Sequence, residues 1–98
     1  MTIAEAKQLR IVDYLASLGY HPQSVTSKQY WYLSPLRNER TPSFKVNDRL
    51  NEWYDFGAAT GGDLVELGKH LYQTDSVSEV LAYIAVSYTH LRAHETGA

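Results

Sequence analysis

The chain alternates between segments with helical apolar spacing and segments with strand-like alternation. A first helix is predicted over residues 4 to 18, where apolar residues recur about every three positions. Gly19 follows directly and can adopt the left-handed conformation that ends a helix. The stripe also allows a break near residues 8 to 10. Its apolar members are Leu9, Val12, Leu15 and Leu18.

Two further helices are predicted in the second half of the chain. Asp63 and Ser76 are expected to be helix N-caps, because each is followed three residues later by a glutamate, the spacing of a capping box. An apolar stripe follows each cap and predicts a helix there. The stripes are formed by Leu64, Leu67 and Leu71, and by Val77, Val80, Leu81 and Ile84.

Strand-like segments lie between the first and the second helix. Residues 29 to 33, 43 to 46 and 51 to 56 alternate or are rich in aromatic side chains, which predicts three short strands, the last two joined as a hairpin. Residues 22 to 27 are predicted as a loop and residues 57 to 62 as a glycine-rich turn. The predicted fold class is therefore α+β, with a small three-stranded antiparallel sheet packed against about three helices.

The end of the chain departs from this organisation. Residues 87 to 98 show no apolar stripe that continues from Ile84. The segment resembles the translated adapter sequence that ends open reading frames assembled from short reads. We therefore expect one domain over residues 1 to 86, a non-native or disordered tail over residues 87 to 98, and a natural protein that continues beyond Val86.

Composition narrows the kind of site that this chain can hold. The 98 residues include no cysteine, which excludes disulfides and every thiolate metal site. The formal net charge is −2, yet residues 28 to 49 carry five basic and two acidic side chains, a local net charge of +3. Such a local excess is compatible with a surface that faces phosphate. No apolar run is long enough to span a membrane, so no membrane association is expected.

Two ordered motifs carry the most specific signal in the sequence. The first is the seven-residue run NERTPSF, from Asn38 to Phe44, and the second is Phe56-Gly57 followed by Gly61-Gly62-Asp63. Together they resemble the zinc-binding domain at the N-terminus of bacterial replicative DNA primases. The overall sequence also resembles the diverged primase-like proteins of bacterial mobile elements. The resemblance covers roughly residues 10 to 72 and implies a fold like a zinc ribbon.

The resemblance also identifies the positions of the zinc ligands. In the family, a cysteine, two spacer residues and a histidine precede the first motif, and two cysteines separated by two residues belong to the second. These four places are occupied here by Ser34, Arg37, Asp55 and Ala58. They do not form a zinc ligand set, since structural zinc sites are built from cysteine and histidine. We therefore expect a metal-free version of the fold, with no zinc and no other cofactor.

Three basic residues are candidates for contact with DNA phosphates. Arg37 and Arg40 lie in the loop that would close on zinc, and a guanidinium offers forked donors to two phosphate oxygens. For Arg37 an ion pair with Asp55 is an equal alternative, because both occupy former ligand places. Lys45 follows Phe44 in a predicted strand and is the third candidate.

Aromatic residues of the predicted strands offer a platform on which bases can stack. Alternation places one residue of each Trp-Tyr pair on each face of the sheet, so one set is expected in the core and the other on the surface. The pattern leaves open which set is which. Trp31 and Tyr54 are the candidates for contact with nucleic acid; Tyr32 and Trp53 are their neighbours in the two pairs.

The resemblance implies a DNA-binding module that contacts single-stranded template DNA during primer synthesis, beside a primase-type catalytic domain. No catalytic residue is predicted, because no nucleophile, base and acid occur at a recognisable spacing. The chain is thus expected to be no enzyme by itself and to be a cytoplasmic fragment of a primase-like nucleotidyltransferase. The alternative is a protein-interaction or structural domain that docks on a catalytic domain or a helicase.

Overall fold

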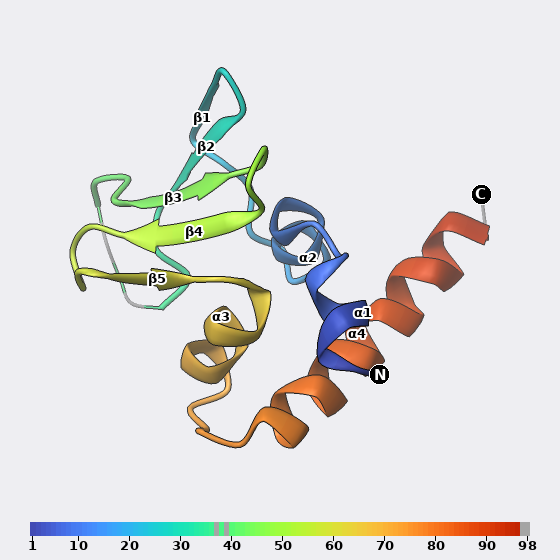
Figure 1. Cartoon of the computed structure of the whole chain (residues 1–98). Coiled ribbons are helices and arrows are strands. Elements are labelled where there is room, and N and C mark those ends of the chain that lie inside the picture. Colours follow the sequence, from blue (N-terminus) through green and yellow to red (C-terminus); the bar gives the residue numbers. More distant parts are fainter. Residues whose placement is uncertain (37, 39, 97–98) are drawn as a thin grey trace.

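The computed structural model describes residues 1–36, 38 and 40–96, with side chains described as far as residue 87. In this part of the chain, a five-stranded antiparallel sheet lies beside four helices (Figure 1). The helices are α1 (Ile3–Lys7), α2 (Ile11–Ser17), α3 (Leu64–Leu71) and α4 (Val77–Thr96). The strands are β1 (Ser24–Thr26), β2 (Gln29–Tyr32), β3 (Phe44–Asn47), β4 (Glu52–Asp55) and β5 (Thr60–Gly62). The fold is α+β, as the sequence predicts.

The strands pair in chain order, and each is antiparallel to the next. The three central strands, β2, β3 and β4, are those predicted from the alternation of the sequence, and a four-residue turn joins the last two. The predicted count of three strands is wrong at both edges of the sheet, where β1 and β5 each add a short strand. The predicted count of about three helices is exceeded because the first helix is divided.

The edge strand β1 occupies a segment that the sequence predicts as a loop. Its residues are exposed, and a two-residue turn at Ser27 and Lys28 leads back into β2. Both turn residues have positive φ, 49° and 64°, which matches the twist of a tight hairpin and normally calls for glycine or asparagine. Neither residue type is present here, so the sequence gives no sign of the turn.

The other edge strand, β5, lies in the segment predicted as a glycine-rich turn. Gly61 pairs with Tyr54 of β4, and a Cβ at Gly61 would lie 2.4 Å from the Trp53 carbonyl oxygen and 2.8 Å from the Tyr54 ring. Glycine is therefore needed here for the close approach of the neighbouring backbone, which is one of its roles in strands. The turn itself is confined to residues 56–59.

Asp63 and Ser76 cap the N-termini of α3 and α4, which confirms the sequence prediction. The Asp63 carboxylate accepts a hydrogen bond from the Glu66 N–H at 2.9 Å, and the Ser76 hydroxyl accepts one from the Glu79 N–H at 3.3 Å. The first predicted helix is interrupted between α1 and α2, near residues 8 to 10, where the apolar pattern permits a break. At the end of α2, Gly19 has a φ of 92°, the left-handed conformation expected of a C-terminal glycine.

The turn between β3 and β4 fixes the junction between α1 and α2. Asn51 Oδ1 accepts a hydrogen bond from the Ile11 N–H at 2.9 Å, and Asn51 Nδ2 donates one to the Leu9 carbonyl at 2.8 Å. Arg10 donates two hydrogen bonds to Asp48, at 3.1 and 2.8 Å, and this contact raises the pKa of Arg10 above its ordinary value. The central hairpin is thereby attached to the N-terminal helices.

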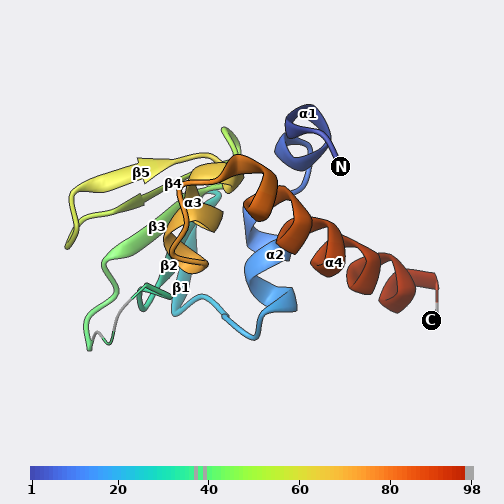
Figure 2. The ribbon, with the colours of Figure 1, turned by 90° about the horizontal axis from the view of Figure 1, so that it is seen from below.

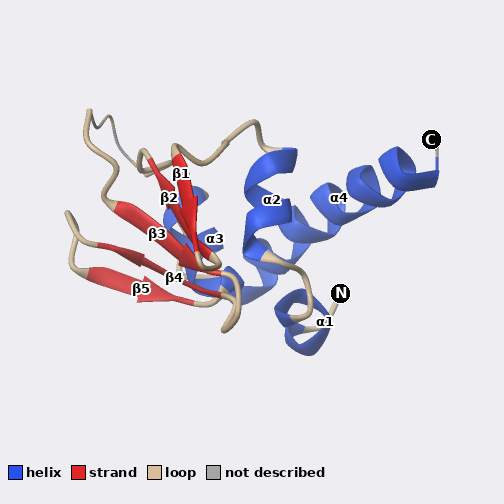
Figure 3. Ribbon diagram, turned by 90° about the horizontal axis from the view of Figure 1, so that it is seen from above, coloured by secondary structure: helices blue, strands red, loops and turns tan. Residues whose placement is uncertain are grey.

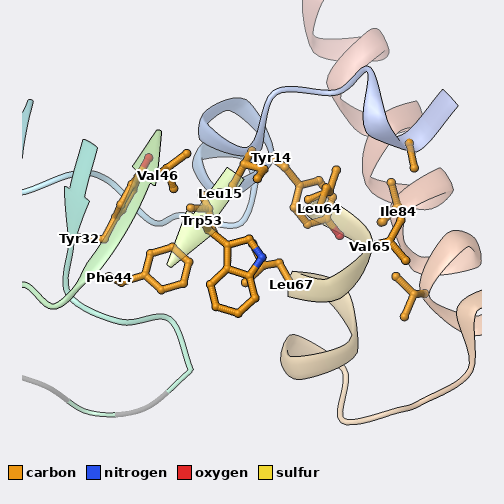
Figure 4. Packing of buried hydrophobic residues seen from close by; sticks show 13 residues of the cluster. Tyr14, Leu15, Tyr32, Phe44, Val46, Trp53, Leu64, Val65, Leu67 and Ile84 are labelled. Carbon is orange, nitrogen blue, oxygen red and sulfur yellow. The ribbon is translucent and has the colours of Figure 1, made fainter. Parts of the chain in front are cut away.

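The core lies between the sheet and the helices (Figure 4). The rings of Phe44 and Trp53 stack with centroids 5.3 Å apart, and Tyr32 meets Phe44 edge to face at 6.0 Å. The Trp53 indole N–H donates to the Asp63 carbonyl at 2.8 Å, so its polar atom is satisfied where α3 begins. The remaining buried apolar residues are Ala6, Ile11, Tyr14, Leu15, Val46, Leu64, Val65, Leu67, Val80 and Ile84.

The first half of α4 is held against α2 and α3. Tyr83 stacks on Tyr72 with ring centroids 4.3 Å apart, and the Tyr72 hydroxyl is hydrogen-bonded to that of Tyr14. The Ser87 hydroxyl donates to the Tyr14 hydroxyl at 3.2 Å. Burial raises the pKa of Tyr14, so it stays a neutral phenol.

The second half of α4 extends away from the other elements (Figures 2 and 3). The helix continues to Thr96, past the boundary that the sequence predicts at residue 86, so residues 87–96 are helical although the sequence shows no helical stripe there. This segment contains alanine, leucine, arginine and glutamate, which have high helix propensity, so it can form a helix although it has no apolar stripe. The non-native origin of the segment stays a prediction. In the described part of the chain, no helix combines the length and the apolarity needed to cross a membrane.

The division of the sheet into a buried and an open face can be tested at two adjacent residues. Trp53→Ala should lower the free energy of unfolding by about 3 to 5 kcal/mol, because it removes a large ring from the core. Tyr54→Ala, a truncation at the next residue on the opposite face, should keep most of the stability. Urea denaturation of both variants measures the difference. Equal losses would contradict the division.

Candidate nucleic-acid interface

The face of the sheet that points away from the helices carries most of the predicted contact residues. In the antiparallel register, Trp31 lies opposite Lys45, Lys45 opposite Tyr54, and Tyr54 opposite Gly61. Directly paired residues share a face of a sheet. The two Trp-Tyr pairs are thus divided as follows: Trp31 and Tyr54 lie on this face, and Tyr32 and Trp53 are buried on the other.

Phe56 joins this row from the turn that follows β4. Its ring stacks on Trp31 with centroids 5.7 Å apart and planes inclined by 20°, and meets Tyr54 edge to face at 4.8 Å. Phe56 is 54% exposed and Tyr54 is 39% exposed. Four residues, Trp31, Lys45, Tyr54 and Phe56, therefore form a continuous surface, which we call the aromatic face.

The ammonium group of Lys45 lies over two rings of the aromatic face. Lys45 Nζ is 5.8 Å from the centroid of the Trp31 ring and 5.6 Å from that of Phe56. Both distances are within the range of a cation–π contact, so the positive charge is fixed beside the rings. A cation that lies between aromatic surfaces can meet a phosphate while bases stack on the rings.

A groove with a volume of about 370 Å³ adjoins the aromatic face. Lys45 and Tyr54 line it together with two glycines of β5, Gly61 and Gly62. Asn47 and Glu52 line it as well, on the same face of the sheet. The groove thus has a basic side chain at one position and an acidic one at another, and an anion bound there would be attracted by the first and repelled by the second.

Of the two predicted arginines, Arg40 lies in the described part of the chain, and no described contact joins it to the aromatic face. Arg40 is exposed in the segment between β2 and β3. Arg37 lies outside the described residues, and so does the predicted choice between phosphate and Asp55 for its partner. The cation that the described contacts do join to the rings is Lys45.

Phe56 was missed as a candidate, although the sequence contained the signal. The alternation that makes Glu52–Asp55 a strand continues by one residue, and it places Phe56 on the same side as Tyr54. The sequence prediction included Phe56 in the strand 51 to 56 and in the glycine motif that follows, but not among the stacking residues. Its stacking on Trp31 depends on pairing between β2, β3 and β4, which the local pattern does not specify.

Three of the four former ligand places, those of Ser34, Asp55 and Ala58, are described, and they lie together at the end of β4. The Ser34 hydroxyl donates to Asp55 Oδ2 at 2.9 Å, and the Leu36 N–H donates to the Ser34 hydroxyl oxygen at 3.1 Å. Asp55 Oδ1 accepts from the N–H groups of Gly57, at 3.0 Å, and Ala58, at 3.3 Å. Asp55 is fully buried, and Ser34 is 6% exposed.

These residues do not fit a zinc ion. A structural zinc site takes four ligands drawn from cysteine and histidine, and the described places offer one hydroxyl, one carboxylate and a methyl group. Both carboxylate oxygens of Asp55 already accept hydrogen bonds from the chain. In the described residues, no group of three or more histidine, cysteine, aspartate or glutamate side chains could hold a metal.

The inner face beside this cluster is lined by aromatic side chains. Tyr32 lies opposite Phe44, and Phe44 opposite Asp55, so a phenol and a phenyl ring adjoin the carboxylate. Burial raises the pKa of Tyr32 to about 12, which keeps the phenol neutral at physiological pH. Asp55 therefore brings a polar centre into a largely apolar layer.

Comparison with known proteins gives one consistent result. The CHC2 zinc finger family matches residues 4–96 of the chain. A DNA primase of Lactococcus lactis subsp. lactis (strain IL1403) is 32% identical over 83 residues, which are 82% of this chain and 13% of that protein. The solved structure of the Aquifex aeolicus primase (zinc-binding and RNA polymerase domains) aligns with a TM-score of 0.68 and 27% identity, over 91% of this chain and 22% of that chain.

The aromatic face should be separable from the stability of the fold. Lys45→Ala should lower the free energy of unfolding by less than about 1 kcal/mol, because cation–π contacts at exposed sites contribute about 0.5 to 1 kcal/mol. Urea denaturation followed by circular dichroism measures the change. A loss as large as that expected for Trp53→Ala would show that Lys45 has a structural role, and would rule out its use as a binding probe.

Proposed function

We propose that this chain, which belongs to the CHC2 zinc finger family, is the module of a primase-like protein that contacts single-stranded template DNA. The chain spans 13% of the length of the Lactococcus lactis primase and 22% of the solved Aquifex aeolicus chain. In our proposal, primer synthesis itself belongs to a catalytic domain beside this module. The chain then contributes binding and no chemistry of its own.

One observation carries the proposal: Lys45 and three aromatic rings lie together on the sheet face opposite the core. Single-stranded nucleic acid is held by stacking of bases on exposed aromatic rings and by cations that follow the backbone. Each stacked base contributes about 1 to 3 kcal/mol. Tyr54 and Phe56 have the exposure that stacking requires, and Lys45 supplies the charge beside them.

The proposed contact residues fall into two groups with different roles. Trp31, Tyr54 and Phe56 would bind bases through their rings, without a requirement for one sequence, because every base has an aromatic face. Lys45 would neutralise a phosphate next to the rings. Arg40 is proposed as a further phosphate contact from the exposed loop. Arg37 keeps both predicted roles, phosphate contact or ion pair with Asp55.

The proposal extends to cofactor, location and origin. The module is proposed to work without zinc, since the residues at the former ligand places do not form a zinc site. It is proposed to act in the cytoplasm, where template DNA is copied, and to belong to a protein of a mobile element.

The competing function is protein docking. An exposed patch of aromatic residues can also bind a neighbouring domain or a helicase, since aromatic side chains are enriched in protein interfaces. The position of Lys45 over the rings favours DNA, because the cation is presented at the centre of the patch. A hydrophobic docking surface would more often have its charges at the rim.

A titration with fluorescently labelled single-stranded DNA at several salt concentrations tests the proposal. Lys45→Ala should weaken binding to every sequence alike and reduce the dependence of log K on log salt by about 0.7, the value for one lost phosphate contact. Tyr54→Ala and Phe56→Ala should each weaken binding about fivefold or more and leave the salt dependence nearly unchanged, because stacking carries no charge.

Two controls separate a specific effect from a general one. Glu52→Gln removes an acid from the same groove and should strengthen binding modestly, whereas Asp75→Asn removes an exposed acid elsewhere and should leave binding unchanged. Absence of any binding by the unaltered chain would sink the proposal. Binding that is indifferent to Lys45, Tyr54 and Phe56 would do the same, and would leave protein docking as the function of this face.

A further inference from the structure

We infer that a hydrogen-bonded cluster centred on the Asp55 carboxylate performs, in this chain, the structural task that zinc performs in its family. The inference concerns how the fold is closed, and it does not depend on whether the module binds DNA. It follows from the contacts at the former ligand places and from their burial, and it says which side chains replaced the metal.

The first argument is topological. A ribbon-type zinc ion joins two segments that are far apart in the sequence, one between β2 and β3 and one that begins at the end of β4. Here the bond from Ser34 to Asp55 joins the same two segments at 2.9 Å, across 21 positions of the chain. Because both residues are buried, the link lies inside the protein, where a polar contact is stronger than in water.

The second argument concerns the local loops. Asp55 Oδ1 accepts the N–H groups two and three residues further on, those of Gly57 and Ala58. Ser34 Oγ accepts the N–H two residues further on, that of Leu36. Each segment is therefore folded into a tight turn around its own side-chain oxygen, and the two oxygens are joined to each other. A metal ion holds its two ligand pairs in a comparable arrangement, with each pair on one turn.

The third argument is energetic. A carboxylate buried in an apolar layer is unfavourable unless hydrogen bonds compensate its lost hydration. Asp55 accepts hydrogen bonds from one hydroxyl and two amides and takes part in a further interaction. A buried acid with this many donors is a fixed centre, since loss of any donor leaves part of the charge uncompensated. Asp55 is thus suited to organise both turns at once.

Removal of the link is the first test, and its readout is thermal melting in excess chelator. Ser34→Ala should lower the melting temperature by about 4 to 8 °C, the shift that loss of about one buried hydrogen bond produces in a domain of this size. Asp55→Ala should lower it further, because it leaves several donors without an acceptor. Asp55→Asn keeps the shape and one acceptor oxygen, and should recover part of that loss.

Matched substitutions at exposed positions serve as controls. Ser24→Ala in β1 and Asp75→Asn in the segment before α4 change the same residue types at the surface, and both should melt like the unaltered chain. If Ser34→Ala has the same melting temperature as these controls, the cluster does not close the fold and the inference is overturned. The unaltered chain should contain no zinc by elemental analysis and should melt identically with and without chelator. Stoichiometric zinc or a chelator-dependent melt would also overturn the inference.

Restoring the family ligands is the converse test. The quadruple variant S34C/R37H/D55C/A58C places three cysteines and one histidine at the four positions. It should bind one Co²⁺ or Zn²⁺ per chain, with the tetrahedral Co²⁺ thiolate spectrum, and its melting should become dependent on the metal. The triple variant that retains Asp55 has one thiolate fewer, so its Co²⁺ thiolate absorption should be weaker than that of the quadruple variant. A quadruple variant without the tetrahedral spectrum would show that the two turns are not arranged as a ligand site, which would contradict the inference.

Discussion

The hydrogen bonds that the Asp55 carboxylate accepts are the interaction on which the rest of the structure depends. Asp55 ends β4, begins the turn to β5, and binds the segment that leaves β2, so it fixes the relative positions of three strands at one end of the sheet. In the family this position carries a zinc ligand; here a buried acid occupies it and accepts hydrogen bonds from one hydroxyl and two amides. By our inference one fold is closed by two kinds of chemistry, because the metal and the buried acid both supply a centre that attracts groups from two turns.

Once the sheet is closed, its register divides the aromatic residues between two tasks. Trp53 and Phe44 face the helices, where burial stabilises the fold, and Trp31, Tyr54 and Phe56 face outward around Lys45. A shift of one residue in the pairing would exchange the two sets. The turn between β3 and β4 prevents such a shift, because Asn51 and Asp48 attach it to the N-terminal helices. The proposed binding surface is therefore a consequence of how the core is packed.

The sequence alone predicted the local elements well and the long-range contacts only in part. Capping residues such as Asp63 and the alternation around Phe44 and Trp53 identified the helices and the central strands, because these signals are local. The hairpin at Ser27 and Lys28 was missed since its positive φ values occur without glycine. The choice between Trp31 and Trp53 for the core could not be made, because it depends on which face the helices cover. The former ligand places were found through the family motif, but the Ser34–Asp55 bond needs two strands to come together.

Amide hydrogen exchange in the presence of excess chelator is the most direct test of the central claim, that Asp55 closes the fold without metal. The amides of Gly57 and Ala58 belong to an exposed turn, so they would exchange rapidly without a buried acceptor. The account predicts that both are protected in the unaltered chain and that Asp55→Ala removes this protection while the amides of α3 remain protected. Rapid exchange at Gly57 and Ala58 in the unaltered chain, or protection that appears only when zinc is added, would contradict it.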